Sequence, residues 1–528
     1  MTNQNYDTII IGAGINGLVA AAYLGKAGLK VLVVERREML GGAAATEEVF
    51  PGYRMNTGSA DIGLFNPRIV SELHLQNHGL QYLDSSALFF LPQLDGDSLT
   101  IFHDREKSRH EIARFSSHDA EKFGFFLERI QSMSAVLEMI ALMTPPDLPN
   151  IRYNQLLPWL RAGLKVKRLG NEQLMEFLRI LPMSINDFLD EWFVTPQLKA
   201  AIGFNGVAGL MQGPRASGTT FMLLYQAVAA GKDAVRASRF CRGGSGMLSE
   251  ALANVVRRYG AEISTGHGVE NITVQDGKVQ GVVLENGRRI NARMVVSSVN
   301  CHHTFFDLVD PTILDVGFVR ELRQIKFRGS TARVNFALER LPSFPGSTSN
   351  KLDGHIIICP NLDILERAYD DAKYGRISQN LVLDLTIPSL LDNSLAPPGK
   401  HVMSVDVRYT PYHLESSNWD TKRESLGDQV VELLEKYSPG FMDLITGRQV
   451  LTPLDYERQY GLQEGCIYHG QMGLDQIAFM RPIPGFARYR TPIENLYLCG
   501  AGTHPGGGVT GLPGYNAARE IIYDLRRS

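Results

Sequence analysis

Residues 6–46 read YDTIIIGAGINGLVAAAYLGKAGLKVLVVERREMLGGAAAT, and this stretch decides the fold of the chain. An apolar run at 8–11 leads into the glycine-rich segment 12–17, and an alanine-rich segment follows at 18–27. This order predicts a strand, a tight turn and a helix. A second strand is expected at 30–34 and ends in Glu35, about twenty residues after the glycines. Together these elements are typical of a dinucleotide-binding unit.

Each glycine of the turn has a separate physical role in such a unit. Gly12 permits the sharp turn, Gly14 permits close approach to a pyrophosphate, and Gly17 permits tight packing of helix on sheet. The amides that begin the helix, at Ile15 and Asn16, are expected to face the phosphates. Glu35 is expected to accept hydrogen bonds from the adenosine ribose, and its charge disfavours a ribose 2′-phosphate. FAD and NAD both remain open on these residues.

A glycine pair, Gly41-Gly42, follows the second strand and continues in Ala43. This loop resembles that of flavoenzymes of the amine oxidase and phytoene desaturase superfamily, where it passes beside the FAD pyrophosphate. Many members of the superfamily carry an arginine or lysine directly after the pair. Ala43 stands at that position here. The resemblance favours FAD, without a cationic phosphate contact at residue 43.

Composition and charge exclude several classes of protein. A chain of 528 residues is expected to divide into two or three domains. The net charge of −3 and the lack of basic segments with interleaved aromatics give no reason to expect a nucleic acid partner. The five cysteines are scattered singly, which excludes a disulfide reductase with a CxxC pair. They are Cys241, Cys301, Cys359, Cys466 and Cys499.

The sequence contains no clear targeting or membrane-spanning segment. Only five residues precede the first expected strand, which leaves no room for a signal peptide. No apolar run reaches the roughly eighteen residues that a membrane helix needs. A cytoplasmic protein is expected, and peripheral membrane contact and a homo-oligomer remain open. His74 and His78 are four residues apart, a spacing that could pair them as ligands, but no third ligand is evident, so no metal is expected.

The pattern along the chain predicts an α/β fold with an interrupted Rossmann-type domain. We expect the FAD-binding domain at 1–80, 240–300 and 465–528, where Asp276-Gly277 and Asn286-Gly287 are hairpin signals. An α+β substrate domain is expected at 81–116 and 301–464, and a mostly helical subdomain at 117–239. The resemblance places a residue near Val269 beside the adenine. No motif between His303 and Arg448 indicates chemistry.

The closing segment supplies the second glycine-rich loop. A buried strand is expected at 495–499, and Gly500-Ala-Gly-Thr-His504-Pro-Gly-Gly-Gly508-Val-Thr510-Gly511 then opens a helix. Its amides are expected to stabilise negative charge on a reduced flavin. This loop resembles that of bacterial phytoene desaturases and carotenoid ketolases. A closer resemblance, over nearly the whole chain, is to the subfamily called pyridine nucleotide-disulfide oxidoreductase domain-containing protein 2.

The resemblance implies a noncovalent FAD enzyme without a redox disulfide. The aspartate that binds the ribityl chain in many other flavoproteins is absent, and Gly502 or Thr503 stands nearby. The expected cofactor-binding residues are Gly12, Gly14, Ile15, Asn16, Gly17, Glu35, Arg36, Gly41, Gly42, Ala43, Val269, Gly500, Gly502, Thr510 and Gly511.

Two histidines are candidates for a catalytic base. His469 lies in an aromatic, glycine-flanked segment before the closing loop, and His504 lies within that loop. Asp475 and Arg481 are expected to form an ion pair that positions this segment.

The function expected from these observations is FAD-dependent oxidation of a hydrophobic substrate, such as an isoprenoid or carotenoid. Hydride would pass to the flavin, and electrons to oxygen or a quinone. The alternative is a flavin-binding protein with a structural or partner-binding role and little turnover.

Overall fold

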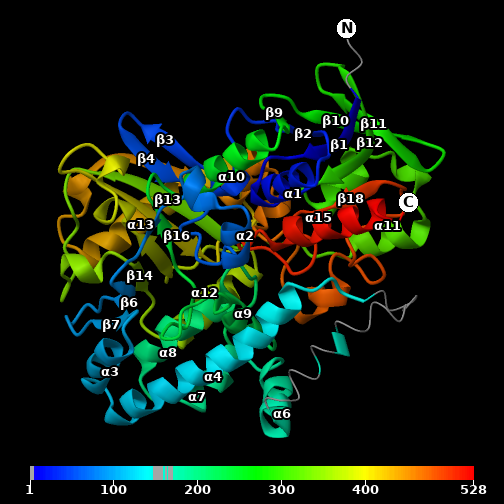
Figure 1. The fold of residues 1–528 in the computed structure, drawn as a ribbon. Coiled ribbons are helices and arrows are strands. Elements are labelled where there is room, and N and C mark those ends of the chain that lie inside the picture. The colour runs from blue at the N-terminus through cyan, green and yellow to red at the C-terminus, as the bar shows by residue number, and fades with distance from the viewer. Residues whose placement is uncertain (1–4, 147–158, 161–162, 164–169, 528) are drawn as a thin grey trace.

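The N-terminal strand lies inside a seven-stranded sheet built from three distant parts of the chain. In the computed structural model, which describes residues 5–146, 159–160, 163 and 170–527, this strand pairs in parallel with one strand on each side (Figure 1). The strand order is β10 (Val269–Gln275), β11 (Lys278–Leu284), β12 (Arg289–Ser297), β1 (Asn5–Ile11), β2 (Val31–Val34) and β9 (Glu262–Ser264), with β18 (Leu496–Leu498) beside β12.

Three helices cover one face of this first sheet. α1 (Ile15–Lys26) packs against α10 (Gly246–Arg258) and α15 (Leu512–Leu525), as Figure 1 shows. Residues 17–25 of α1 are all buried, because this small helix is enclosed by the sheet and two neighbouring helices. The predicted strand–turn–helix unit is confirmed. The helix begins at Ile15, three residues before the predicted start, because Gly14 already serves as its N-cap.

A second seven-stranded sheet forms the other half of the molecule. Its strands are antiparallel except for one parallel pair, β14 with β6. The strand order is β17 (Ile445–Leu451), β13 (Thr331–Leu338), β16 (His401–Arg408), β15 (Leu383–Thr386), β14 (His355–Ile358), β6 (Ala87–Leu91) and β7 (Leu99–Phe102).

The two faces of the second sheet differ in character. One face packs apolar side chains such as Val334, Val405 and Leu385 in a core with α13 (Trp419–Tyr437). The opposite face carries polar and charged side chains that are nonetheless buried. A sheet with one polar face normally exposes that face to water. Here the polar face is turned toward the interior.

A helical layer covers the far end of the second sheet. Phe126 of the longest of these helices contacts Phe193 edge-on, with ring centroids 4.9 Å apart. The helices of this layer are α3 (Arg105–Ala113), α4 (Ser117–Ala141), α6 (Asn171–Ile180), α7 (Ile185–Asp190), α8 (Pro196–Gly203), α9 (Thr219–Gln226) and α12 (Leu362–Lys373). Most of 147–169, an interior part of the expected helical subdomain at 117–239, lies outside the described residues.

Short elements complete the structure. Two hairpin-sized sheets join β3 to β4 and β5 to β8. The remaining elements are β3 (Thr46–Phe50), β4 (Tyr53–Asn56), β5 (Tyr82–Leu83), β8 (Phe240–Cys241), α2 (Pro67–Glu72), α11 (Val316–Arg323) and α14 (Pro453–Tyr460). Within the part of the chain that the structure describes, no helix combines the length and apolarity needed to cross a bilayer.

Candidate functional site

A cavity of about 370 Å³ lies between the two sheets. One end is lined by residues that follow β1 and β2, and the other by side chains of β13, β15 and β16. The size is that of a small-molecule pocket, for which about 300–1,000 Å³ is usual. Residues from both halves of the chain therefore meet around one enclosed space.

The first end of the cavity is formed by the glycine loops, which we define as residues 12–17 and 41–44. Gly12 has a φ of +91°, so the turn after β1 has the left-handed geometry that glycine favours. A Cβ atom on Gly14 would have no heavy atom within 4 Å, whereas one on Gly17 would lie 2.1 Å from the carbonyl oxygen of Gly12. Gly14 thus leaves its backbone open, and Gly17 permits close packing.

The glycine loops fit the pyrophosphate end of FAD. The N-terminus of α1 has no side-chain cap, and the Oδ1 atom of Asn16 is buried without a partner among the described residues. Such a helix end attracts anionic phosphate groups. Of the predicted cofactor residues, those that line the cavity are Gly12, Gly14, Ile15, Asn16, Glu35, Arg36, Gly41, Gly42, Ala43 and Val269.

Glu35 lies at the end of β2 with a nearly buried carboxylate. Its Oε2 atom accepts a hydrogen bond from the Ala13 amide at 2.8 Å, and Oε1 accepts one from the Arg37 amide at 2.9 Å. Each carboxylate oxygen can accept a further bond. Glu35 therefore braces the first glycine loop while it lines the cavity, a structural role that the sequence did not reveal.

Three other predicted glycines, in the closing loop, do not line the cavity but allow close packing against other parts of the protein. A Cβ atom on Gly500 would lie 2.4 Å from the Ser298 carbonyl oxygen, and one on Gly502 would lie 2.9 Å from that of His469. A Cβ atom on Gly511 would lie 2.7 Å from Phe65. Thr510, which also lies off the cavity wall, accepts the Asn66 amide at 3.1 Å through its carbonyl oxygen.

The closing loop contributes different residues from those predicted. Ala501, Gly508 and Val509 line the cavity, and so does Ser298, which follows β12. The Ser298 hydroxyl donates to the carbonyl oxygens of residues 11 and 12, at 2.8 and 3.0 Å. No local sequence signal distinguishes this serine, because its role depends on the parallel pairing of β12 with β1.

Arg481 holds the closing loop against the segment that contains His469. Its guanidinium donates to the carbonyl oxygens of Ala501 at 2.8 Å and Gly470 at 3.1 Å. The predicted Asp475–Arg481 ion pair is wrong, because Asp475 pairs with Lys326 at 3.2 Å. Arg481 is fully buried among backbone carbonyls instead, and burial lowers its pKa.

The two candidate histidines occupy different positions. His469 lines the cavity, and its Nδ1 atom is buried without a hydrogen-bond partner among the described residues. Burial, reinforced by the charge of Arg481, lowers its pKa to about 4. His504 lies off the cavity wall, with Nε2 3.1 Å from the Ile140 carbonyl oxygen, and burial lowers its pKa to about 4 as well. Both rings are therefore neutral near pH 7.

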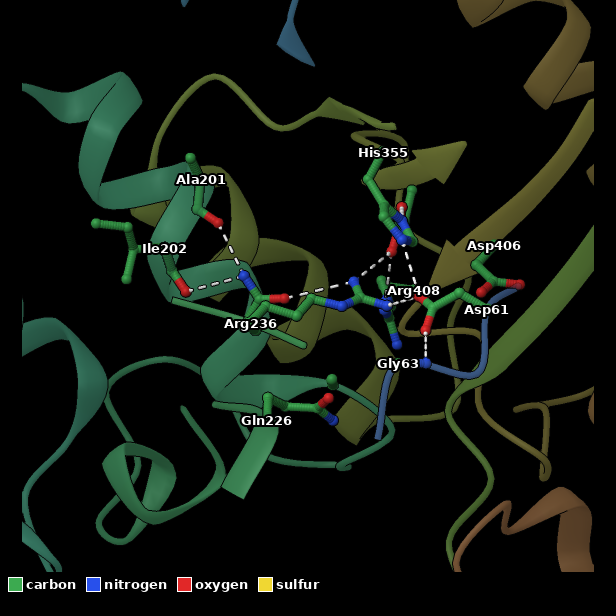
Figure 2. Close-up of polar contacts among 12 residues, drawn as sticks. Asp61, Gly63, Ala201, Ile202, Gln226, Arg236, His355, Asp406 and Arg408 are labelled. Atoms are coloured by element: carbon green, nitrogen blue, oxygen red, sulfur yellow. Dashed lines mark hydrogen bonds and ion pairs between the residues drawn. The ribbon is translucent and has the colours of Figure 1, made fainter. Parts of the chain in front are cut away.

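The second end of the cavity is a network of buried charges that the sequence did not lead us to expect (Figure 2). No motif between His303 and Arg448 indicated such a site, yet side chains of four strands in this range form most of the network. We call it the charged cluster, and it consists of Asp61, Arg236, Arg333, His355, Asp384, Asp406 and Arg408.

Strand register brings these charges to one face. Arg333 pairs with Asp406 across β13 and β16, and Asp406 pairs with Asp384 across β16 and β15. Directly paired residues point to the same side of a sheet, as do residues two apart on one strand, such as Asp406 and Arg408. The alternation in 401–408, HVMSVDVR, was visible in the sequence. It is typical of a face exposed to water, so it did not indicate a buried site.

His355 connects two carboxylates at the centre of the charged cluster. Its Nδ1 atom lies 2.7 Å from Asp384 Oδ1, and its Nε2 atom lies 3.0 Å from Asp61 Oδ2. Burial and the charge of Arg236 lower the pKa of His355, but Asp384 and Asp61 outweigh both, so that the pKa is raised. Since ionised carboxylates only accept hydrogen bonds, both ring nitrogens donate and the imidazole is protonated.

Comparison with known proteins agrees with this geometry. The chain is 37% identical to pyridine nucleotide-disulfide oxidoreductase domain-containing protein 2 of Rattus norvegicus, covering 99% of this chain and 94% of the relative. It is 25% identical to the lycopene-forming phytoene desaturase of Pantoea ananas, covering 96% of each. A triple mutant of putrescine oxidase shares the fold, with a TM-score of 0.60, 15% identity and 99% coverage of both chains.

A family model extends over nearly the whole chain. The model described as flavin containing amine oxidoreductase matches residues 15–522, a range that includes α1, the second sheet, every strand of the first sheet except β1, and the closing loop. The predicted cofactor and the predicted resemblance to phytoene desaturases are confirmed. The chain belongs to the flavin-containing amine oxidoreductase family and is an FAD-dependent oxidoreductase.

Proposed function

We propose that this enzyme removes hydride from a largely hydrophobic substrate, such as an isoprenoid or carotenoid, and passes the electrons to oxygen or a quinone. One observation carries the proposal: the cavity continues past the glycine loops between apolar side chains. These are Leu64, Ala208, Ala237, Ile467 and Tyr468. They adjoin a buried apolar core, so the transfer of an apolar substrate from water into this part of the cavity is favourable in free energy.

The wall of this part of the cavity is held by hydrogen bonds to backbone. The Tyr468 hydroxyl donates to the Ala208 carbonyl oxygen at 2.9 Å, and the Tyr225 hydroxyl donates to the Gly507 carbonyl oxygen at 2.7 Å. Two segments far apart in the sequence are thereby fixed across the cavity. A rigid wall of this kind orients a substrate and excludes water, which oxidation beside a flavin requires.

Bound FAD supplies the hydride acceptor. The protein must then hold the substrate and accept any proton that leaves with the hydride. We assign the second task to His469, because its neutral ring lines the cavity and its Nδ1 atom has no other partner among the described residues. The position of His504 beside the Ile140 carbonyl gives it no comparable access.

The test is anaerobic reduction of the enzyme-bound flavin by candidate apolar compounds, both hydrocarbons such as phytoene and long-chain isoprenoid carboxylates. Bleaching of the visible flavin absorbance by such a compound is expected, and readmission of oxygen or a soluble quinone identifies the acceptor. The His469→Gln variant should retain FAD and bleach about 100-fold more slowly or worse. A flavin that dithionite reduces but that no apolar compound reduces would overturn the proposal.

A further inference from the structure

The charged cluster contains more positive than negative charge. In the part of the chain that the structure describes, three arginines and the protonated His355 face three aspartates, an excess of one positive charge. Arg333 and Asp406 balance each other at 2.7 Å. The excess positive charge therefore belongs to the group formed by Arg236, Arg408 and His355. These three cations contact only two carboxylates, those of Asp61 and Asp384.

Arg408 is the least satisfied cation of the cluster. Its Nη2 atom lies 3.4 Å from Asp384, a long contact, and its Nε atom is buried without a hydrogen-bond partner among the described residues. The residue is only 9% exposed and lines the cavity. Its guanidinium lies 5.0 Å from the ring centre of Phe204, which holds the group in place but does not neutralise it.

Arg236 extends the same positive region. Its guanidinium lies 2.8 Å from Asp61 and 3.6 Å from Asp384, and its Nε atom is buried without a partner among the described residues. Arg236 and Arg408 both contact Asp384, and Figure 2 shows the two side chains close to His355 and Asp61. A buried excess charge with unused donors costs free energy unless something neutralises it.

We propose that Arg408, with Arg236 behind it, binds the carboxylate of the substrate at this end of the cavity. The inference rests on the proposed function, and it makes the substrate an apolar molecule with one carboxylate group. A monoanion matches the single excess charge. A planar carboxylate also suits the two-pronged donor geometry of a guanidinium. The apolar part of the molecule then lies between Leu64, Ala237 and Tyr468.

The charge network explains why the two arginines remain available for a ligand. Asp384 and Asp61 are both bonded to His355, at 2.7 and 3.0 Å, and so share their negative charge among three cations. Neither carboxylate forms a two-pronged pair with Arg408. The aspartates and His355 thus position the arginines without saturating them.

The experiment is titration calorimetry on the holoenzyme with octanoate, methyl octanoate and octanol. Octanoate should bind about tenfold tighter, or more, than either uncharged analogue, because a charge-assisted hydrogen bond contributes that much. The preference should disappear in Arg408→Met and persist in part in Arg408→Lys. Arg448→Met is the matched control: it lies on β17 of the same sheet, pairs with Asp428 and Glu424, and does not line the cavity.

The unmodified enzyme alone can overturn the inference. Equal binding of octanoate and methyl octanoate would exclude a carboxylate site, whatever happens to the variants. Loss of the preference in Arg448→Met as well as Arg408→Met would overturn the assignment to Arg408. Calorimetry detects binding without turnover, so its result stays distinct from a failure of flavin reduction by apolar compounds. That failure would count against the proposed function itself.

Discussion

The two ends of the cavity are built by different means. The glycine loops form one end from backbone, with almost no side chains, and their geometry follows from local steric freedom. The charged cluster forms the other end from long side chains on four neighbouring strands and two loops. The first end has the backbone geometry that suits a phosphate-bearing cofactor, and the second end presents buried charges to the cavity. The first end is encoded by neighbouring residues in the sequence, whereas the second is assembled from distant segments.

Replacing a glycine of the glycine loops by alanine should have the largest effect. Two such variants should distinguish loss of protein stability from loss of FAD affinity. Gly17→Ala places a Cβ atom 2.1 Å from the Gly12 carbonyl oxygen, so we expect about 3 kcal/mol or more of lost stability and little bound FAD. Gly14→Ala meets no atom within 4 Å and should keep the melting temperature of the apoprotein while FAD binds about tenfold more weakly or worse. Thermal unfolding and FAD titration measure the two effects. Equal apoprotein stability in both variants would contradict this distinction.

Breaking the charged cluster should have the next largest effect. Asp384→Asn removes a carboxylate that serves His355, Arg236 and Arg408, and it leaves buried cations without a partner. We expect a loss of about 3–5 kcal/mol. The control Asp428→Asn removes an exposed partner of Arg448 and should cost less than about 1 kcal/mol. Urea unfolding of the two variant holoenzymes measures both losses in the free energy of unfolding. Similar losses would show that Asp384 contributes no more to stability than an exposed carboxylate does.

The pH dependence of stability should differ in sign between the two buried histidines near the closing loop and the histidine of the charged cluster. His469 and His504 have pKa values lowered from 6.5 to about 4, so the unfolded chain binds more protons between these pH values. Stability should therefore fall as the pH decreases from 6.5 to 4, by up to about 3 kcal/mol for each histidine. The pKa of His355 is raised, so its contribution is present below pH 6.5 and is lost as the pH rises through its folded pKa.

Variants can separate these contributions. His469→Gln should flatten the loss of melting temperature on the acid side, and the exposed His110→Gln should leave that loss unchanged. His355→Gln should be destabilised most at low pH. An acid profile of His469→Gln identical to that of the wild type would show that His469 does not carry the effect.

The smallest effect is expected at the rim of the closing loop. Asp475→Asn removes the ion pair with Lys326, in which the side chains are 64% and 51% exposed. Stability should change by less than about 1 kcal/mol, with FAD retained. Arg481→Gln is the informative comparison, because it removes buried hydrogen bonds to the loop carbonyls, and it should release FAD more readily. Equal FAD retention in both variants would contradict a role of Arg481 in holding the loop.

Much of the first sheet and its glycine loops could be predicted because their signals are local. The turn at residues 12–17, the acid at Glu35 and the hairpins at Asp276-Gly277 and Asn286-Gly287 each depend on neighbouring residues. The closing loop was predicted as a unit, but the residues that line the cavity were not. Gly500 and Gly502 pack against backbone and Gly511 against the Phe65 side chain, because glycine permits close approach to protein as well as to ligand.

The sequence by itself determined the dinucleotide fold, because strand, glycine turn, helix and acid follow one another within forty-one residues, 6–46. The resemblance of the Gly41-Gly42 loop and the closing loop to those of flavoenzymes then favoured FAD and oxidoreductase chemistry. Only the tertiary structure decided the charged end of the cavity. Arg333, His355, Asp384 and Arg408 lie on separate strands, and each alone resembles a residue on a solvated face. Strand register and the covering helices turn that face inward. Burial brings these charges into one hydrogen-bonded network, in which the positive charges exceed the negative charges by one.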